Sequence, residues 1–178
     1  YLGTNEYWVN GANSGSGIFG AGSCSSSTRG ITFGGGTGPS QVNEINYITI
    51  GTLGNSVDFG DLSAAKLYMQ GMSSSTRGVV GGGYQESGFT STNVIEFITI
   101  ASEGNTTDFG DLTVARRDGH STSNSIRGIF AGGYNPTFQN VIDFVTIAST
   151  GNASDFGDLL TLRRTGASWG DSHGGLGD

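Results

Sequence analysis

Charged residues are scarce in this sequence, and the acids outnumber the bases. Of the 178 residues only 13% are charged, and 15 Asp and Glu against 8 Lys and Arg give a formal net charge of −7. Such a chain is repelled by the phosphate backbone of DNA or RNA. Nucleic acid is therefore an unfavourable partner.

Cysteine and long apolar runs are also nearly absent. Cys24 is the only cysteine, which excludes an internal disulfide framework and a zinc site made of several cysteines. We interpret it as a tolerated small side chain. No apolar run approaches the ~20 residues that a membrane-spanning helix needs. The chain begins at Tyr1 with neither a methionine nor a signal-like segment, which indicates a processed, truncated or partial chain.

Hydrophobic residues are few and glycines are many. Only 34% of the residues are hydrophobic, whereas 33 are glycine. A helical or doubly wound α/β domain is hard to build from this composition, because glycine favours turns and closely packed strands. No segment of helix length carries an apolar stripe with a period of 3.6 residues. The composition therefore predicts an all-β fold.

What the sequence does contain is one motif of twenty residues written three times. The copies read NEINYITIGTLGNSVDFGDL at 43–62, NVIEFITIASEGNTTDFGDL at 93–112 and NVIDFVTIASTGNASDFGDL at 140–159. The period of about 50 residues is the length expected for kelch units, which place four strands in each propeller blade. Three residues outside the motif and three within it mark the same period: Arg29, Arg77, Arg127, Asp58, Asp108 and Asp155.

Glycines divide each copy into four short strand candidates. Apolar runs at 31–36, 79–84 and 129–134 follow an Arg-Gly step and stop at glycines that permit a sharp turn. The Ser-rich stretch before each arginine, such as GHSTSNS at 119–125, gives another strand. The Asp-rich and Gly-rich DFGD segment predicts a twisted or edge strand after a turn at 103–105.

The remaining candidate, NVIEFITI at 93–100, is expected to be an interior strand. Ile98 and Ile100 alternate with Ile95 and Phe97, so apolar side chains fall on both faces of the strand. An interior strand buries such side chains on both sides. We therefore predict burial of four residues from this strand and its counterpart in the third copy: Ile98, Ile100, Val145 and Ile147.

These motifs resemble those of the kelch family. The run VARRDGHSTSNSIRGIFAGGY at 114–134, followed by a variable loop and NVIDFVTI at 140–147, is similar to a kelch blade. In DFGDL the Phe stands where kelch units usually carry tryptophan. The copies resemble still more closely the ITIAS-GN-DFGDL arrays of tail-fibre and virion structural proteins from marine bacteriophages, especially cyanophages. The resemblance covers about residues 14–164.

The resemblance implies an antiparallel β-propeller and a place in the virion. Repeats at 14–62, 63–112 and 113–164 would be full blades, and the flanking residues 1–13 and 165–178 read as partial blades. Closed propellers have four to eight blades, and stacked repeats bury their faces only against neighbours. We therefore expect further repeats, other copies of the chain or other virion proteins to complete the fold. Residues such as Tyr47 and Phe59 at one end, and Phe144 and Phe156 at the other, should line the open faces.

The repeated carboxylates could belong to a kinase-like magnesium site or to a calcium site. An Asp-Phe-Gly holds magnesium in kinases, but this sequence lacks the HRD and VAIK motifs that accompany it. Pairs such as Asp58 and Asp61 suit calcium, although the acid-every-second-residue pattern of calcium loops is missing. Capping of turn amides by Asp58, Asp108 and Asp155 is the favoured interpretation, with each DFGD phenylalanine packed between blades. The sequence assigns no metal and no cofactor.

The repeated arginines and the two histidines each allow a structural and a functional interpretation. One arginine in each copy suits salt bridges or hydrogen bonds to backbone carbonyls between blades, and a ligand-binding ring of arginines is the alternative. His120 and His173 lie in Ser/Gly-rich stretches without a repeated carboxylate or cysteine, so catalytic or metal roles are disfavoured. Galactose oxidase, a kelch-type copper enzyme, needs a tyrosine crosslinked to cysteine, and Cys24 has no obvious partner. We predict that the chain is not an enzyme.

The loop after the Gly-Gly step differs from copy to copy. It reads TGPSQV, QESGFTST and NPTFQ. Exposed loop aromatics stack on sugar rings, which makes Phe89, Tyr134 and Phe138 the candidate ligand-loop residues. The expected function is a tail-fibre or surface-appendage module of a phage particle that serves assembly and attachment to the host surface. The alternative is a cellular kelch-type module that binds protein or carbohydrate, which should carry one conspicuous unrepeated pocket.

Overall fold

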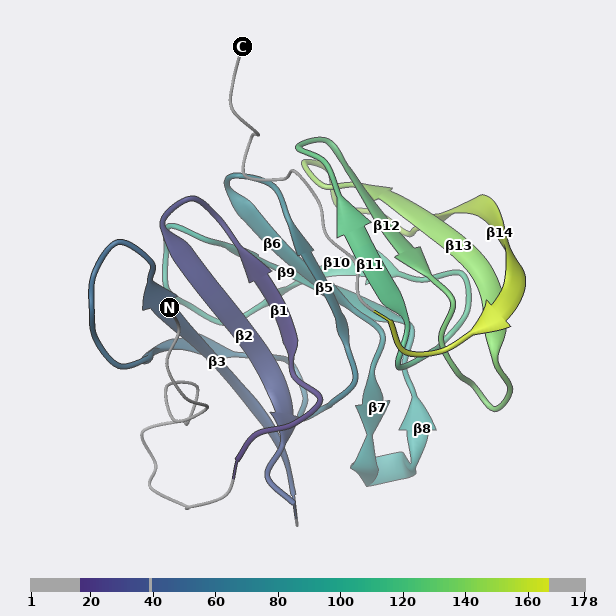
Figure 1. Cartoon of the computed structure of the whole chain (residues 1–178), viewed down its shortest axis with the longest axis horizontal. Coiled ribbons are helices and arrows are strands. Elements are labelled where there is room, and N and C mark those ends of the chain that lie inside the picture. Colours follow the sequence, from purple (N-terminus) through teal and green to yellow (C-terminus); the bar gives the residue numbers. More distant parts are fainter. Residues whose placement is uncertain (1–16, 39, 167–178) are drawn as a thin grey trace.

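The computed structural model describes residues 17–38 and 40–166, and these residues form an all-β fold of antiparallel sheets (Figure 1). They include no α-helix and one short 3-10 turn, η2 (Glu86–Gly88). The fold class predicted from composition and repeats is confirmed at this level. The expected partial units fall almost wholly outside the described residues.

Three four-stranded sheets follow one another along the chain, each within one of the three sequence repeats. A small hairpin, β7 (Tyr84–Gln85) with β8 (Thr90–Ser91), is inserted in the second sheet and projects from the lower edge in Figure 1. The sheets are composed as follows: β1 (Gly22–Ser25), β2 (Arg29–Gly36), β3 (Gln41–Thr49) and β4 (Val57–Asp61) in the first; β5 (Gln70–Ser73), β6 (Arg77–Gly81), β9 (Val94–Thr99) and β10 (Thr107–Asp111) in the second; β11 (His120–Ser123), β12 (Arg127–Ala131), β13 (Gln139–Thr146) and β14 (Ser154–Arg163) in the third.

Strand order within each sheet repeats the order in the chain. The Ser-rich stretch pairs with the strand that follows it, so it is the first strand of its sheet. The strands that contain ITI or VTI are interior, as predicted, because each has a partner on both sides. The DFGD strands β4, β10 and β14 lie at sheet edges, also as predicted.

The glycine of each DFGD strand has a steric role. Gly60 and Gly110 have φ of 144° and 141°, and the strand pairing shifts register beside each of them. A Cβ at Gly60 would lie 2.4 Å from the backbone of Gly104 in the next sheet. Glycine at this position therefore permits both the bulge and the close approach of the neighbouring sheet.

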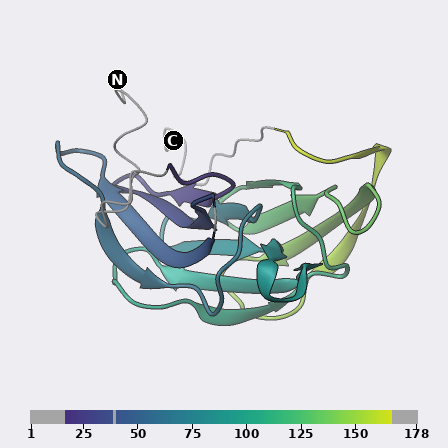
Figure 2. The same cartoon turned by 90° about the horizontal axis from the view of Figure 1, so that it is seen from below.

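Adjacent sheets lie side by side, as Figures 1 and 2 show, with β1 next to β5 and β5 next to β11. Two apolar clusters fill the spaces between them. Ile31, Phe33 and Phe59 of the first sheet pack against Val80 and Ile98 of the second. The cluster between the second and third sheets consists of Met72, Val79, Ile95, Phe109, Leu112, Phe130, Val145 and Ile147.

The predicted core is confirmed, while one prediction about the end faces is wrong. Ile98, Ile100, Val145 and Ile147 are at most 3% exposed. Phe59, expected on an open end face, is instead 2% exposed and packs in the first cluster, with Tyr47 beside it. The reason is the direction of stacking: the side of each sheet that carries the DFGD phenylalanine faces the next sheet, not the preceding one.

The array is open at both ends, since the described residues do not close into a ring. Ile50, on the first sheet, and Phe156, on the third, are each 54% exposed. Their counterparts in the second sheet, Ile100 and Phe109, are each 2% exposed. The same repeat positions are thus buried where a neighbouring sheet is present and exposed where none is described.

Candidate functional site

The repeated arginines connect one sheet to the next. Arg29 Nη1 donates a hydrogen bond of 2.7 Å to the carbonyl of Ile100, and Arg77 Nη1 donates one of 2.8 Å to the carbonyl of Ile147. Arg29 also forms an ion pair, with 3.6 Å between its Nη2 and Glu103 Oε1. This is the bonding to carbonyls between repeats that the sequence favoured for these arginines.

Each repeated arginine also stacks on an aromatic ring of its own sheet. The guanidinium carbons lie 4.3 Å from the ring centre of Tyr47 for Arg29, 4.2 Å from that of Phe97 for Arg77 and 4.6 Å from that of Phe144 for Arg127. Such stacking holds the guanidinium plane in place through cation–π attraction. Arg127 is exposed, because the described residues include no sheet beyond the third.

A second connection joins a loop of one sheet to the DFGD strand of the sheet before it. We call residues 53–57, 103–107 and 150–154 the Gly-Asn loops. Gly104 N donates to Phe59 O (2.7 Å), Thr106 N donates to Asp61 O (2.9 Å), and Asp61 N donates to Asn105 Oδ1 (3.0 Å). The third sheet repeats all three bonds on β10: Gly151 N to Phe109 O, Ala153 N to Asp111 O, and Asp111 N to Asn152 Oδ1.

These bonds cover a sheet edge that would otherwise be open. The outer strand of a sheet presents unpaired amides and carbonyls that invite pairing with another chain. In the first two sheets the loop of the next sheet occupies that edge. The repeated Gly-Asn and DFGD motifs are therefore two halves of one contact. Both motifs are visible in the sequence, but only the structure shows that they bind each other.

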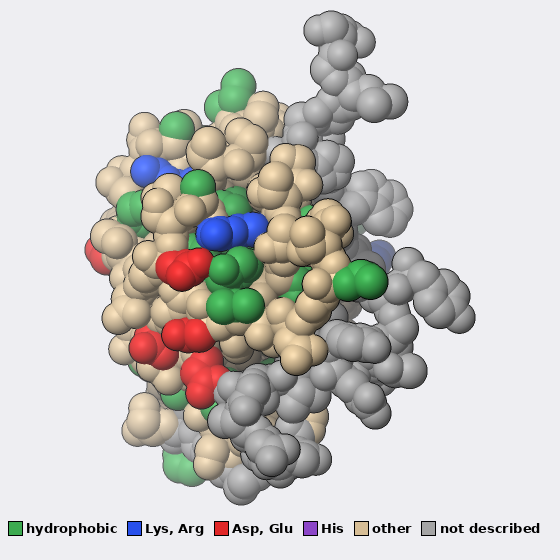
Figure 3. Space-filling view, turned by 90° about the vertical axis from the view of Figure 1, so that its left-hand side faces the viewer, with side chains coloured by type: hydrophobic (Ala, Val, Ile, Leu, Met, Phe, Trp, Pro, Cys, Tyr) green, Lys and Arg blue, Asp and Glu red, His purple; other side chains and the backbone are tan. Residues whose placement is uncertain are grey.

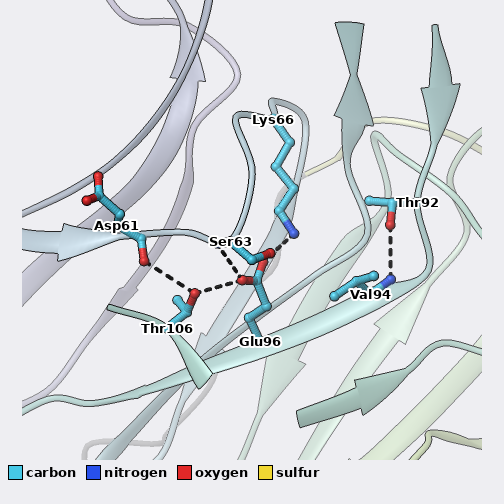
Figure 4. A network of polar contacts seen from close by, with 7 residues as sticks. All are labelled: Asp61, Ser63, Lys66, Thr92, Val94, Glu96 and Thr106. Carbon is cyan, nitrogen blue, oxygen red and sulfur yellow. Dashed lines mark hydrogen bonds and ion pairs between the residues drawn. The ribbon is translucent and has the colours of Figure 1, made fainter. Parts of the chain in front are cut away.

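A buried ion pair lies beneath this contact (Figure 4). Lys66 Nζ binds Glu96 Oε2, and both side chains are at most 2% exposed. The other carboxylate oxygen accepts from Ser63 N (2.9 Å) and from the Thr106 hydroxyl (2.7 Å). Burial opposes ionisation of Glu96, but the charge of Lys66 and these hydrogen bonds outweigh it and lower the pKa of the carboxyl below its usual value.

The third sheet contains the corresponding pair, Arg116 with Asp143, at 2.8 Å and without exposure of either side chain. Burial lowers the pKa of Arg116, and the adjacent carboxylate of Asp143 opposes that shift. Sequence reasoning missed both pairs. They were visible in the aligned copies, where a basic residue recurs at 66 and 116 and an acidic one at 96 and 143.

The repeated aspartates form no cluster in the structure. Asp58, Asp108 and Asp155 are exposed, and Asp155 Oδ1 accepts a 3.1 Å hydrogen bond from Gly157 N. Within residues 17–38 and 40–166, no three His, Cys, Asp or Glu side chains gather in the manner of a metal site. The DFGD motif led us to expect all three phenylalanines between sheets; Phe59 and Phe109 pack there, whereas Phe156 is 54% exposed.

The candidate ligand residues lie on the unrepeated loops. Phe89 is 77% exposed on the β7–β8 hairpin, at a φ of 51°. Tyr134 and Phe138 are brought together on the β12–β13 loop, with ring centres 5.8 Å apart in an edge-to-face arrangement. Phe138 borders an open depression of about 390 Å³ that residues 161–165 also line. The Ser91 hydroxyl, which donates to Tyr134 O (3.4 Å), links the hairpin to this loop.

Arginines extend this aromatic surface in a way that the sequence analysis did not anticipate. The Arg117 guanidinium lies 4.3 Å from the ring centre of Tyr84 and 5.1 Å from that of Tyr134. Arg164 lies 5.5 Å from the Tyr134 ring centre. The paired arginines at 116–117 and 163–164 were the available signal. Together these side chains offer rings for stacking and guanidinium groups for hydrogen bonding.

The lone cysteine and the histidines do not form a reactive site in the described part of the chain. Burial raises the pKa of the Cys24 thiol to about 12, so it is not a nucleophile near neutral pH. His120 Nδ1 is buried without a hydrogen-bond partner. His173 lies outside the described residues.

Comparison with known protein families gives no match for this sequence, and comparison with curated proteins gives none either. The described residues contain no helix that is long and apolar enough to cross a membrane. The assignment of function therefore depends on the architecture and the exposed residues.

Proposed function

We propose that this chain is a segment of a kelch-type β-propeller that serves as a structural module of a phage virion, in a tail fibre or another surface appendage. The proposal is supported by four-stranded antiparallel sheets that follow the chain order and stand with their first strands adjacent, as the blades of a propeller do. The proposal assigns no catalytic role to the chain.

One observation carries the proposal: repeated residues join neighbouring sheets at both internal junctions, whereas Phe89 and Phe138 are exposed on loops that are not repeated. Arg29, Arg77 and the Gly-Asn loops bond one sheet to another. Phe89 and Phe138, at 77% and 48% exposure, lie on the two inserted loops. A constant scaffold with variable loops suits attachment, because loops change without cost to the core.

The scaffold part of the proposal is tested on the particle itself. An antibody raised against the purified chain, used as a gold label in electron microscopy of phage from the source sample, should mark the tail or surface appendages. Labelling confined to host cells would overturn the virion assignment and favour the cellular module.

The loops are tested by binding. We expect them to bind a host-surface glycan, and Phe89→Ala and Phe138→Ala should each weaken retention of the chain on host cells or on a glycan array. Ile126, which is 67% exposed in the turn between β11 and β12, provides the matched control, and Ile126→Ala should bind as the wild type does. Equal binding by all variants would contradict the role of the loops.

The cellular kelch-type module is the second candidate. It is favoured by the stacked Tyr84, Arg117, Tyr134 and Arg164, which occur without a full counterpart in the first sheet. Such a surface suits a carbohydrate or an acidic peptide segment. The labelling experiment separates this candidate from the virion module.

A further inference from the structure

Each end of the sheet array displays one half of a contact that the chain makes twice internally. The internal contact, which we call the joint, combines a Gly-Asn loop on a DFGD edge, an arginine on a carbonyl, and an apolar cluster between the two sheets. The first sheet contributes its DFGD edge to a joint but leaves its Gly-Asn loop unused. The third sheet contributes its loop and leaves its DFGD edge, β14, unused.

The unused loop retains the residues that the joint requires. Gly54 and Asn55 stand at the positions of Gly104 and Asn105, and Gly54 has the same extended positive φ, 158° against 151°. Leu53 beside them is fully exposed, and Ile50 is 54% exposed. A loop with this conformation is therefore already shaped for docking.

The unused edge retains its half as well. Gly157 has a φ of 136°, close to the values at Gly60 and Gly110. A Cβ at Gly110 would meet the backbone of Gly151 at 2.4 Å, whereas a Cβ at Gly157 would meet no described atom within 4 Å. Phe156, at the position of the buried Phe109, is 54% exposed. The edge thus has the bulge and the aromatic residue of the joint without the loop that covers them.

We propose that these two halves bind each other between two copies of this chain, head to tail. Gly54 N of one copy donates to Phe156 O of the other, Asp158 N donates to Asn55 Oδ1, and Arg127 donates to the carbonyl of Ile50. Each bond is the counterpart of one made within the chain. The proposal does not depend on the phage assignment.

The two surfaces also match in character. The third sheet presents Phe144, Phe156 and Arg127, and the first presents Leu53 and Ile50. Leu53 stands at the position of Glu103, which pairs with Arg29 inside the chain. In the proposed joint Leu53 would contact the rings of Phe144 and Phe156. Covering these apolar side chains is favourable, and a heterologous contact of this kind forms a ring when its rotation closes. Two copies bring six sheets together, within the four to eight blades of propellers.

One segment must move for the joint to form. Gly133 N donates to Arg163 O, as Gly35 N donates to Lys66 O in the first sheet. In a head-to-tail pair, Ile18 of the second copy would compete with Arg163 for this amide. We therefore expect association to be weaker than the internal joints and to appear at micromolar concentrations.

Cross-linking between two single-cysteine variants tests the joint directly. Asn55→Cys and Asp158→Cys proteins, mixed and treated with a short bismaleimide, should give a cross-linked pair, while either variant alone should give little. Cys24 is partly buried and its thiol pKa is raised to about 12, so it should react little, and the wild-type chain treated in the same way measures its contribution. Ser125→Cys, an exposed site in the β11–β12 turn, mixed with Asn55→Cys, measures the background. Pairs formed as readily by each variant alone would overturn the head-to-tail arrangement.

Light scattering across a concentration series provides the second measurement. The wild type should increase in mass with concentration, and Phe156→Arg should raise the dissociation constant by about tenfold or more, as expected for a central aromatic residue. Ile126→Arg, a control at another exposed apolar residue (67% against 54%), should leave it unchanged. A wild-type chain that remains monomeric at tens of micromolar, without the mixed cross-link, would overturn the proposal. Species larger than a dimer support it, since an open head-to-tail contact repeats.

Discussion

Ile50, Ile100 and Ile147 stand at one repeat position and are 54%, 2% and 1% exposed. Their sequence contexts are nearly the same, and each ends an interior strand with ITI or VTI. What differs is whether a preceding sheet covers the side chain. At the scale of residues, burial in this protein is a property of the neighbour as much as of the strand.

The isoleucines provide a matched stability test. Ile147→Ala should lower the free energy of unfolding by about 2–5 kcal/mol, because it leaves a cavity between the second and third sheets. Ile50→Ala removes the same atoms from an exposed site and should change it by about 0.5 kcal/mol or less. Urea unfolding of both variants at a concentration below association makes the comparison. Equal losses would contradict the assigned stacking of the sheets.

The buried ion pair leads to a second prediction. Lys66→Met leaves the Glu96 carboxylate buried without its cation, and we expect a loss of about 3–5 kcal/mol in the free energy of unfolding. Adding Glu96→Gln removes the unpaired charge but keeps an oxygen for Ser63 N and the Thr106 hydroxyl. The double variant should therefore be more stable than Lys66→Met alone. A double variant less stable than the single one would show that the charge itself is not the cause.

Glu44 gives the first sheet a pH dependence. Burial raises the pKa of its carboxyl, and Asp58 and Asp61 raise it further. Figure 3 shows several acidic side chains on one face of the molecule. Because the unfolded chain then loses the proton at lower pH than the folded one, ionisation of Glu44 favours unfolding as the pH rises through this range.

Glu44→Gln should therefore gain stability relative to the wild type as the pH rises from about 4 to about 7, since glutamine has no proton to lose. Thermal unfolding of both proteins at intervals across this range measures the difference. A difference that stays constant with pH, or that grows toward acid, would contradict the assigned cause.

At the scale of elements, the three DFGD strands begin with nearly the same sequence but differ in length. β4 and β10 end at Asp61 and Asp111, whereas β14 continues to Arg163. After β4 and β10 the chain turns away from its own sheet, and Lys66 and Arg116 form buried ion pairs with acidic residues of the next sheet. In the third sheet the strand continues to pair along β13 as far as Gln139.

The Gly-Asn loops are tested by one substitution at two positions. Asn105→Ala removes the acceptor for Asp61 N and should cost about 0.5–1.5 kcal/mol of unfolding free energy. Asn55→Ala changes the equivalent loop, which has no sheet before it in the described residues, and should leave the stability of the monomer unchanged. Chemical denaturation of dilute protein measures both. A larger effect at Asn55 than at Asn105 would contradict the role given to these loops.

At the scale of the whole molecule, stability comes from the contacts between sheets, each of which buries one face of its neighbour. Two apolar clusters, two arginine bonds and two buried ion pairs lie at the two internal junctions. The outer faces of the first and third sheets lack these contacts among the described residues. The fold is in this sense a repeat array whose terminal units differ from its interior.

Calcium should not contribute to this stability. The repeated aspartates are exposed and do not converge on one point in the described part of the chain. Addition of EDTA is therefore expected to leave the melting temperature unchanged, because removal of an ion affects only a protein that binds it in the folded state. A rise of several degrees on adding calcium would contradict this.

The sequence by itself determined the all-β class, the four strands of each unit, the interior position of the ITI strands and the burial of Ile98 and Ile147. These features follow from local rules: two-residue alternation, the turn-forming property of glycine and a repeat whose copies align. Phe89, Tyr134 and Phe138 were also selected from sequence, because only their loops depart from the repeat, and their role in binding remains a prediction.

Only the tertiary structure decided which face of each sheet meets which neighbour. Side chains alternate between the two faces of a strand, which fixes the face that carries Phe59 and, on the neighbouring strand, the face that carries Glu44. Nothing in a strand's own sequence shows whether the preceding or the following sheet covers a given face. Hence Phe59 proved to be buried and Ile50 exposed. The bond between a Gly-Asn loop and a DFGD edge joins residues more than forty positions apart, and its geometry exists only once two sheets have stacked.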